Sequence, residues 1–162
     1  MKKRDFLKKS SLGALGAFFA PQLLAALESS QDKIIRTAHI GVGNMGAEDL
    51  KAIASHEQVE VVALCDVDSE YLKAAAVLYP QARTFSDYRV MLTELSDTID
   101  AVIVSTPDHT HAPASLLAME LDKAVYCQKP LAHRVEEVRA MKKMAADKNL
   151  TTQMGIQVHS FY

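Results

Sequence analysis

The chain has 162 residues, of which 49% are hydrophobic and 23% are charged, an ordinary composition for a globular protein. Its length suits one domain with a substantial core and is short for two domains of the usual size. Residues 1–27 hold five basic side chains and one acidic side chain. The rest of the chain therefore holds 13 of the 18 basic and 19 of the 20 acidic side chains, a net charge of −6. Such an acidic body is poorly suited to bind nucleic acid or an anionic membrane.

Residues 1–30 have the pattern of an export signal. A basic stretch runs to Ser11, and a mildly apolar run rich in Gly and Ala follows from Leu12. The basic stretch contains Lys3-Arg4-Asp5-Phe6-Leu7-Lys8, which resembles the twin-arginine export motif with lysine in place of the first arginine. We expect export to the periplasm or cell envelope, with the segment cleaved near Leu27 or kept as a membrane anchor. Ordinary secretion and an amphipathic surface helix are the alternatives.

Residues 34–54 predict a strand, a glycine turn and a helix. An apolar run over 34–40 enters Gly41-Val42-Gly43-Asn44-Met45-Gly46, and apolar residues at helical spacing follow over 47–54. Gly41 allows a tight turn, Gly43 lets the backbone approach a pyrophosphate, and Gly46 lets the helix pack against the strand. The free N–H groups at the helix start then bind phosphate. We therefore expect Asn44 and Met45 to contact the ligand together with the three glycines.

An acidic residue follows at the spacing that this turn requires. A second apolar run, 59–65, ends in Asp66, twenty residues after Gly46, where a dinucleotide-binding fold places the carboxylate that accepts from the ribose hydroxyls. That carboxylate repels a 2′-phosphate, and residues 67–68 offer no arginine, so NAD is favoured over NADP. A methyl-donor or mononucleotide site and a purely structural turn are the alternatives.

Strands and helices keep alternating through the rest of the chain. Apolar runs predict strands over 82–85, 101–105, 124–127 and 151–154. Helical spacing predicts helices over 69–79, 86–95, 114–121 and 134–148, and 106–113 is expected to be a polar loop. The pattern indicates one α/β domain over residues 34–158, a doubly wound parallel sheet of the Rossmann type, with its ligand beyond the carboxyl ends of the strands.

This topology predicts whether the two cysteines can form a disulfide. In the strand order 3-2-1-4-5-6 the strands that end in Cys65 and Cys127 lie three spacings apart, about 14 Å. A disulfide needs Cα atoms within about 7 Å. We therefore expect two buried free thiols.

Five motifs in order resemble the amino-terminal domain of the Gfo/Idh/MocA family (glucose-fructose oxidoreductase and inositol dehydrogenase), particularly its exported members. The motifs are the glycine turn, Cys65-Asp66-Val67-Asp68, Phe85-x-Asp87-Tyr88-Arg89, Ser105-Thr106-Pro107-Asp108-His109-Thr110-His111-Ala112-Pro113 and Tyr126-Cys127-Gln128-Lys129-Pro130-Leu131-Ala132-His133. The resemblance covers residues 34 to about 160. It implies an oxidoreductase that uses NAD(H) or NADP(H) to move hydride to or from a carbon of a sugar or cyclitol.

The resemblance also assigns site residues. It places Lys129 beside the reacting hydroxyl, where an ammonium can stabilise developing alkoxide charge, with a solvated turn lysine as the alternative. Three loop residues, Thr106, Pro107 and Asp108, would border the cofactor, and His111 would contact it or the loop. Gln128 is also expected to contact the cofactor; it stands where the family has glutamate, and an amide cannot pair ionically with Lys129.

Two expected absences complete the prediction. His109 and His111 lie two residues apart without a third ligand, so no metal site is expected. The second domain of the family, which carries most of the substrate pocket, is absent from this sequence. Whether the chain alone is an enzyme stays open. Its alternatives are a non-catalytic NAD-binding module acting as sensor, carrier or relic, and a relative of the NAD-dependent glycosidases.

Overall fold

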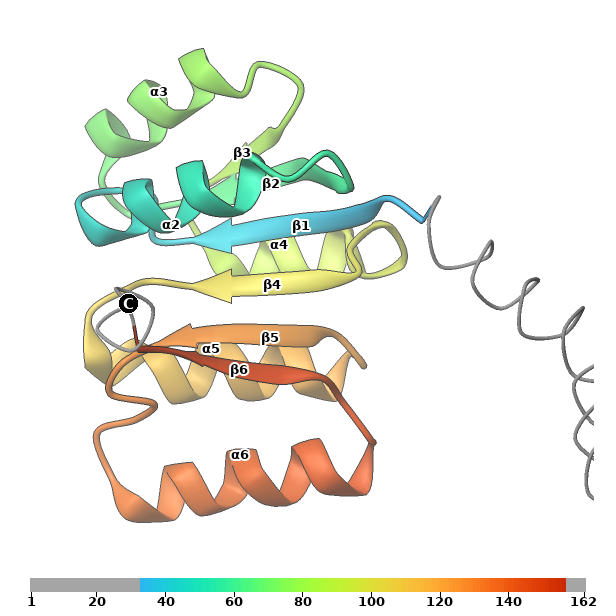
Figure 1. Cartoon of the computed structure of the whole chain (residues 1–162). Coiled ribbons are helices and arrows are strands. Elements are labelled where there is room, and N and C mark those ends of the chain that lie inside the picture. Colours follow the sequence, from blue (N-terminus) through green and yellow to red (C-terminus); the bar gives the residue numbers. More distant parts are fainter. Residues whose placement is uncertain (1–32, 157–162) are drawn as a thin grey trace, which may run out of the picture. The chain divides into compact units, whose positions relative to one another are not determined.

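The computed structural model describes residues 33–156 (Figure 1). The expected export signal, residues 1–30, lies outside the described residues, as does the end of the predicted domain at 157–158. The elements are β1 (Ile35–Ile40), α2 (Met45–Ala54), β2 (Val59–Cys65), α3 (Ser69–Leu78), β3 (Arg83–Phe85), α4 (Tyr88–Glu94), the 3₁₀ helix η1 (Ser96–Thr98), β4 (Ala101–Val104), α5 (Asp108–Glu120), β5 (Ala124–Gln128), α6 (Val135–Asp147) and β6 (Thr152–Gly155). Within residues 33–156 no helix is long and apolar enough to span a bilayer.

The six strands form one parallel sheet in the order β3-β2-β1-β4-β5-β6. This is the Rossmann order, so the predicted fold class is confirmed. Strands β2 and β3 are added on one side of β1 and strands β4, β5 and β6 on the other, so the strand order reverses between β1 and β4. Because all strands are parallel, their carboxyl ends, and the loops that follow Ile40, Cys65 and Val104, meet at one edge.

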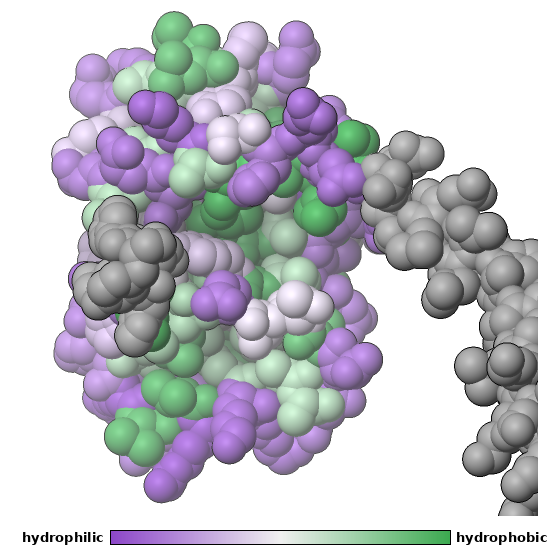
Figure 2. All heavy atoms as spheres, viewed as in Figure 1, coloured by the Kyte–Doolittle hydropathy of each residue, from purple (hydrophilic) through white to green (hydrophobic). Residues whose placement is uncertain are grey.

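Helices cover the sheet from both sides (Figure 1). The larger apolar cluster joins the sheet to α4, α5 and α6 and includes Leu92, Ala118 and Met141. A smaller cluster on the other side, around Leu50 and Leu64, joins it to α2 and α3. On that side α2 and α3 contact β1 and β2, and Figure 2 shows hydrophobic residues at the middle of this face. The strands lack alternation because both faces of the inner ones are buried.

Carboxylates fix the starts of two helices beside the carboxyl edge. Asp68 accepts a hydrogen bond from the Glu70 N–H at 2.8 Å, and Asp87 accepts one from the Arg89 N–H at 2.8 Å. Such caps satisfy N–H groups that the helix itself leaves free. Asp68 is thus the residue that caps α3.

The prediction of a polar loop over 106–113 was wrong in its extent, because α5 already begins at Asp108 and contains Pro113. The ring of His111 explains the early start. Its Nε2 lies 2.7 Å from the Thr106 carbonyl oxygen and its Nδ1 lies 2.6 Å from that of Pro130. These contacts hold the first turn of α5 against two loops. Because the residues of this turn are polar, a search for apolar residues at helical spacing does not detect it.

Both cysteines are buried free thiols, as predicted. Burial is the main cause that raises the pKa of Cys65 to about 12, and burial also raises the pKa of Cys127. The thiolate is the reactive form of cysteine, so neither side chain is suited to nucleophilic chemistry.

A neutral histidine lies inside the sheet. His39 is 1% exposed, and burial lowers its pKa from the ordinary 6.5 to about 3. Its Nε2 lies 3.2 Å from Thr37 Oγ1, which itself donates to the Glu60 carbonyl oxygen. His39 Nδ1 has no partner among the described atoms. Charging this ring inside the folded protein is therefore unfavourable.

We expect His39 to weaken the fold in acid. Between pH 6.5 and 3 the unfolded chain binds a proton at this histidine and the folded chain does not. The free energy of unfolding therefore decreases as the pH is lowered, by up to about 1.4 kcal/mol per pH unit. His39→Leu should make that slope shallower in urea unfolding at pH 7, 5 and 4. The exposed His56, changed to Gln, is the control, and equal slopes for His39→Leu and wild type would contradict this interpretation.

Candidate dinucleotide-binding site

A groove of about 980 Å³ lies at the carboxyl edge of the sheet. Its walls are the glycine turn, the ends of β2 and β3, the start of α4 and the loop that leads from β4 into α5. The predicted cofactor residues that line it are Gly41, Gly43, Asn44, Met45, Asp66, Thr106 and Pro107. The lining does not include the other predicted residues, Gly46, Asp108, His111, Gln128 and Lys129.

Two glycines hold the turn close to the neighbouring loop. Gly41 has φ +82°, and a Cβ there would lie 2.6 Å from the Ser105 carbonyl oxygen. A Cβ on Gly46 would collide with the carbonyl oxygen of Gly41. A side chain at either position would therefore separate α2 from β1 or from the loop after β4. This is the role in helix packing that the spacing predicts for Gly46.

The third glycine has a neighbour that the sequence does not reveal. A Cβ on Gly43 would lie 2.5 Å from the ring of Tyr71, which reaches the turn from α3. The hydroxyl of Tyr71 accepts a hydrogen bond from Asn44 Nδ2 at 3.2 Å. Tyr71 is 41% exposed and lines the groove. Glycine at position 43 therefore accommodates an aromatic ring, whether or not a phosphate also approaches it.

Asp66 joins the end of β2 to the glycine turn. One carboxylate oxygen accepts from the Val42 N–H at 2.8 Å and the other accepts from the Asp68 N–H at 2.9 Å. A carboxylate has about four acceptor sites, so each oxygen can accept a further bond from a hydroxyl group. The carboxylate is thus held in place at the groove, as a ribose contact requires.

An arginine also reaches this part of the groove, although residues 67–68 contain none. Arg89 pairs with Asp87 at 2.9 Å and lies over the ring of Tyr88. Hydrogen bonds from Arg89 are the main cause that lowers the pKa of Asp87. All three residues line the groove. The charge of Arg89 is therefore already paired within the protein.

Asp49 is a supporting residue that the sequence analysis missed: it does not line the groove itself, but it bonds to Ser105, which does. It lies one turn into α2, is 7% exposed, and accepts from Gln128 Nε2 at 3.1 and 2.9 Å and from Ser105 Oγ at 2.6 Å. A carboxylate is thus present beside Gln128, contributed by another element. The signal in the sequence was an acidic residue next to Leu50 on the buried face of a helix.

Gln128 and His111 act inside the protein. Gln128 is 4% exposed, and its Oε1 accepts from the main-chain N–H of Lys129 at 3.1 Å. The side chain of Lys129 itself is exposed. His111 is 2% exposed, and both of its ring nitrogens lie within hydrogen-bond distance of main-chain oxygens. These two residues position the loops around the groove, and the role of Lys129 stays a prediction.

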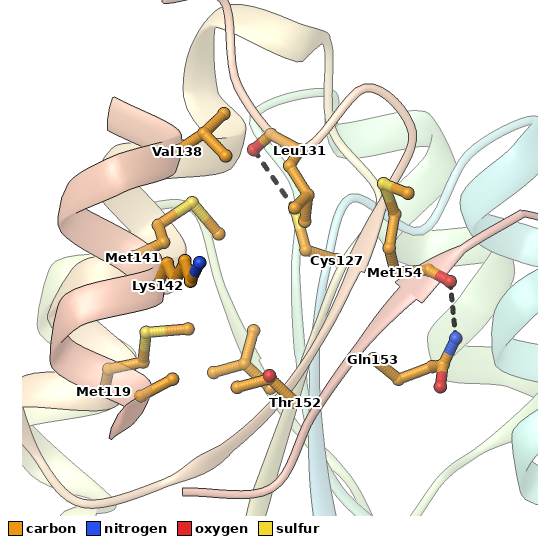
Figure 3. Close-up of a pocket in the computed structure, with 11 residues that line it drawn as sticks. Met119, Cys127, Leu131, Val138, Met141, Lys142, Thr152, Gln153 and Met154 are labelled. Atoms are coloured by element: carbon orange, nitrogen blue, oxygen red, sulfur yellow. Dashed lines mark hydrogen bonds between the residues drawn. The ribbon is translucent and has the colours of Figure 1, made fainter. Parts of the chain in front are cut away.

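The described residues contain no cluster of three His, Cys, Asp or Glu side chains that could hold a metal ion. His109 and His133 lie 4.0 and 3.7 Å from Asp108 at the surface. A second cavity, of about 310 Å³, lies between α6 and the edge strand β6. Figure 3 shows Met141 and Met154 on opposite sides of it. Its lining is mainly apolar and includes no described carboxylate or glycine turn, so the groove is the better candidate site.

Taken together, the site has the parts that a dinucleotide needs. Glycines without a Cβ bring the backbone to the start of a helix, a fixed carboxylate follows β2, and the groove lies where the strand order of the sheet reverses. These features define a dinucleotide-binding Rossmann domain.

Comparison with known proteins identifies the family. Residues 35–156 match the Gfo/Idh/MocA oxidoreductase family with an NAD-binding Rossmann fold. The chain therefore belongs to this family, as its motifs predict. A relative from Shewanella woodyi, a glycosyl hydrolase family 109 protein, is 39% identical over 112 residues, which are 64% of this chain and 24% of that protein.

Solved structures agree with this assignment. Myo-inositol 2-dehydrogenase from Lactobacillus plantarum superposes with a TM-score of 0.71 and 30% identity, over 79% of this chain and 38% of that one. The WlbA dehydrogenase from Chromobacterium violaceum, solved with NADH and UDP-GlcNAcA, gives a TM-score of 0.67 and 29% identity, over 76% and 35%. The chain thus spans about a quarter to two fifths of the length of these relatives.

We expect Gly43→Ala to destabilise the fold by about 1–3 kcal/mol, because the new methyl group meets the Tyr71 ring. Tyr71→Ala should relieve this cost, so the double variant should show a coupling of about 1 kcal/mol or more in urea unfolding. Gly46→Ala is the matched control, since its Cβ meets main chain that Tyr71→Ala leaves in place. Additive effects of Gly43→Ala and Tyr71→Ala would show that the ring does not restrict this position.

Proposed function

We propose that this chain binds NAD in the groove and forms the nucleotide-binding part of an oxidoreductase that moves hydride to or from a carbon of a sugar or cyclitol. The observation that carries the proposal is the groove that joins the glycine turn to the fixed carboxylate of Asp66. The relatives support it, since they include a myo-inositol dehydrogenase and a dehydrogenase solved with NADH and a nucleotide sugar.

Each residue then has a defined task. Bound NAD supplies the hydride acceptor. Asp66 accepts hydrogen bonds from the adenosine ribose, and the free N–H groups at the start of α2 hold the pyrophosphate. Thr106 and Pro107 border the opposite half of the groove. Lys129 donates a hydrogen bond from its ammonium to the substrate oxygen and stabilises the negative charge that develops there.

NAD suits the groove better than NADP. The carboxylates of Asp66, Asp68 and Asp87 line it, and Arg89 is the one cation in its described lining apart from histidine. Asp87 already pairs with that guanidinium. A 2′-phosphate would therefore add negative charge to a region where carboxylates predominate.

The relative from Shewanella woodyi supports a second candidate, a glycosidase that uses NAD. Both reactions need the same nucleotide site, so the groove does not separate them. Net formation of NADH with a free sugar or cyclitol would favour the dehydrogenase, whereas cleavage of a glycoside without net NADH would favour the glycosidase. A third candidate, a binding module without turnover, predicts neither reaction.

We further propose that the chain is exported, which rests on the basic and apolar composition of residues 1–30. A reporter fused after residue 27 should reach the periplasm, and export should stop when the twin-arginine pathway is blocked. Continued export after that block would indicate ordinary secretion, and a reporter that stays in the cytoplasm would contradict the proposal.

Calorimetric titration of the full chain tests the nucleotide proposal. NAD and NADH should bind, and NADP should bind at least about tenfold more weakly because of repulsion at Asp66. Asp66→Ala should weaken NAD binding roughly tenfold to a hundredfold through the lost charge-assisted hydrogen bonds. The exposed Asp97, changed to Ala, is the control. Unchanged NAD affinity in Asp66→Ala, or equal affinity for NADP, would refute the assignment.

A further inference from the structure

Asp49 brings a carboxylate into the protein interior beside the groove. Its three hydrogen bonds come from an amide and a hydroxyl group, both neutral donors. Among the described residues it forms no ion pair, while six ion pairs of lysine or arginine with a carboxylate occur elsewhere in that part of the chain. Neutral donors stabilise an ionised carboxylate but leave its net charge in place.

The negative charge of Asp49 lies close to one half of the groove, the half at the ends of β4 and β5. Asp49 bonds to Ser105, directly after β4, and to Gln128, the last residue of β5. Asp66 lies on the other side of β1, at the end of β2. If the adenosine binds at Asp66 and the pyrophosphate at the start of α2, the nicotinamide extends over the ends of β4 and β5.

The charge of Asp49 also acts beyond its hydrogen-bond partners. After burial, the negative charge of Asp49 is the next cause that raises the pKa of the Tyr126 phenol on β5. The nicotinamide ring carries one positive charge in NAD and none in NADH. A nearby fixed negative charge in a poorly solvated site stabilises the oxidised ring selectively.

We propose that Asp49 sets the redox preference of the site by favouring oxidised NAD over NADH. Gln128 and Ser105 hold the carboxylate beneath the carboxyl ends of β4 and β5 without cancelling its charge. The side chain acts on the cofactor through its charge and takes no part in proton transfer. This inference rests on the proposed NAD-binding function.

The test measures the ratio of the dissociation constants of NAD and NADH by calorimetry on the full chain. Asp49→Asn keeps the shape of the side chain and removes its charge, so the ratio of the NAD constant to the NADH constant should rise roughly five- to tenfold. A tenfold change corresponds to about 30 mV in the two-electron potential of the bound cofactor. Glu57→Gln is the matched control, because it removes an exposed charge from the turn before β2, and it should leave the ratio unchanged.

Two double variants keep the test informative if Asp49→Asn does not fold. Asp49→Asn with Gln128→Glu moves the carboxylate from α2 to β5 and restores an amide partner, so the ratio should stay within about twofold of wild type. Asp49→Leu with Gln128→Met removes the charge together with its main partner, a replacement that proteins often tolerate, and should raise the ratio as Asp49→Asn does. Thermal unfolding verifies each fold.

The outcomes separate this inference from the function on which it rests. A wild-type chain that binds neither NAD nor NADH refutes the proposed function. Binding of both, with the same ratio in wild type and in the folded variants without the charge, overturns the role of Asp49 and leaves the nucleotide site intact. A ratio that rises in the variants without the charge, and stays unchanged in Glu57→Gln, supports the inference.

Discussion

The buried carboxylate of Asp49 joins the three segments that meet at the groove. It belongs to α2, whose start is the proposed phosphate-binding end, and it bonds to Ser105 after β4 and to Gln128 at the end of β5. The amide at position 128 is the natural partner of this carboxylate. A glutamate there would place two carboxylates within hydrogen-bond distance, where both cannot be ionised at low cost. Gln128 suits this position because its amide donates to the Asp49 carboxylate without adding a second negative charge.

His111 makes the second connection among these loops. Its ring nitrogens lie within hydrogen-bond distance of the main-chain oxygens of Thr106 and Pro130, so the ring holds the loop after β4 against the loop after β5. Asp66 does the same between β2 and the glycine turn. Three buried or half-buried polar side chains thus hold the loops at the carboxyl edge, while the apolar clusters hold the sheet and helices. The shape of the groove depends on the first set.

Much of the fold could be predicted because it is determined by local sequence patterns. Apolar runs, glycines and caps such as Asp68 act within a few residues, and the strand order follows from the alternation of strands and helices. Asp49 and Gln128 lie 79 residues apart, and Asn44 and Tyr71 lie 27 apart, so no local pattern connects them. The start of α5 was missed for the same reason, since His111 holds it through Pro130. Local spacing predicted the candidate nucleotide site, whereas the contacts that support it could be seen only in the structure.

A crystal structure of the full chain with NAD would test the central claim most directly, that the groove orients the dinucleotide from Asp66 to Asp49. The account predicts the adenosine ribose hydroxyls within hydrogen-bond distance of the Asp66 carboxylate, the pyrophosphate at the start of α2, and the nicotinamide beside Thr106 on the side of Asp49 and Gln128. A dinucleotide bound in the reverse direction, or in the cavity between α6 and β6, would contradict it.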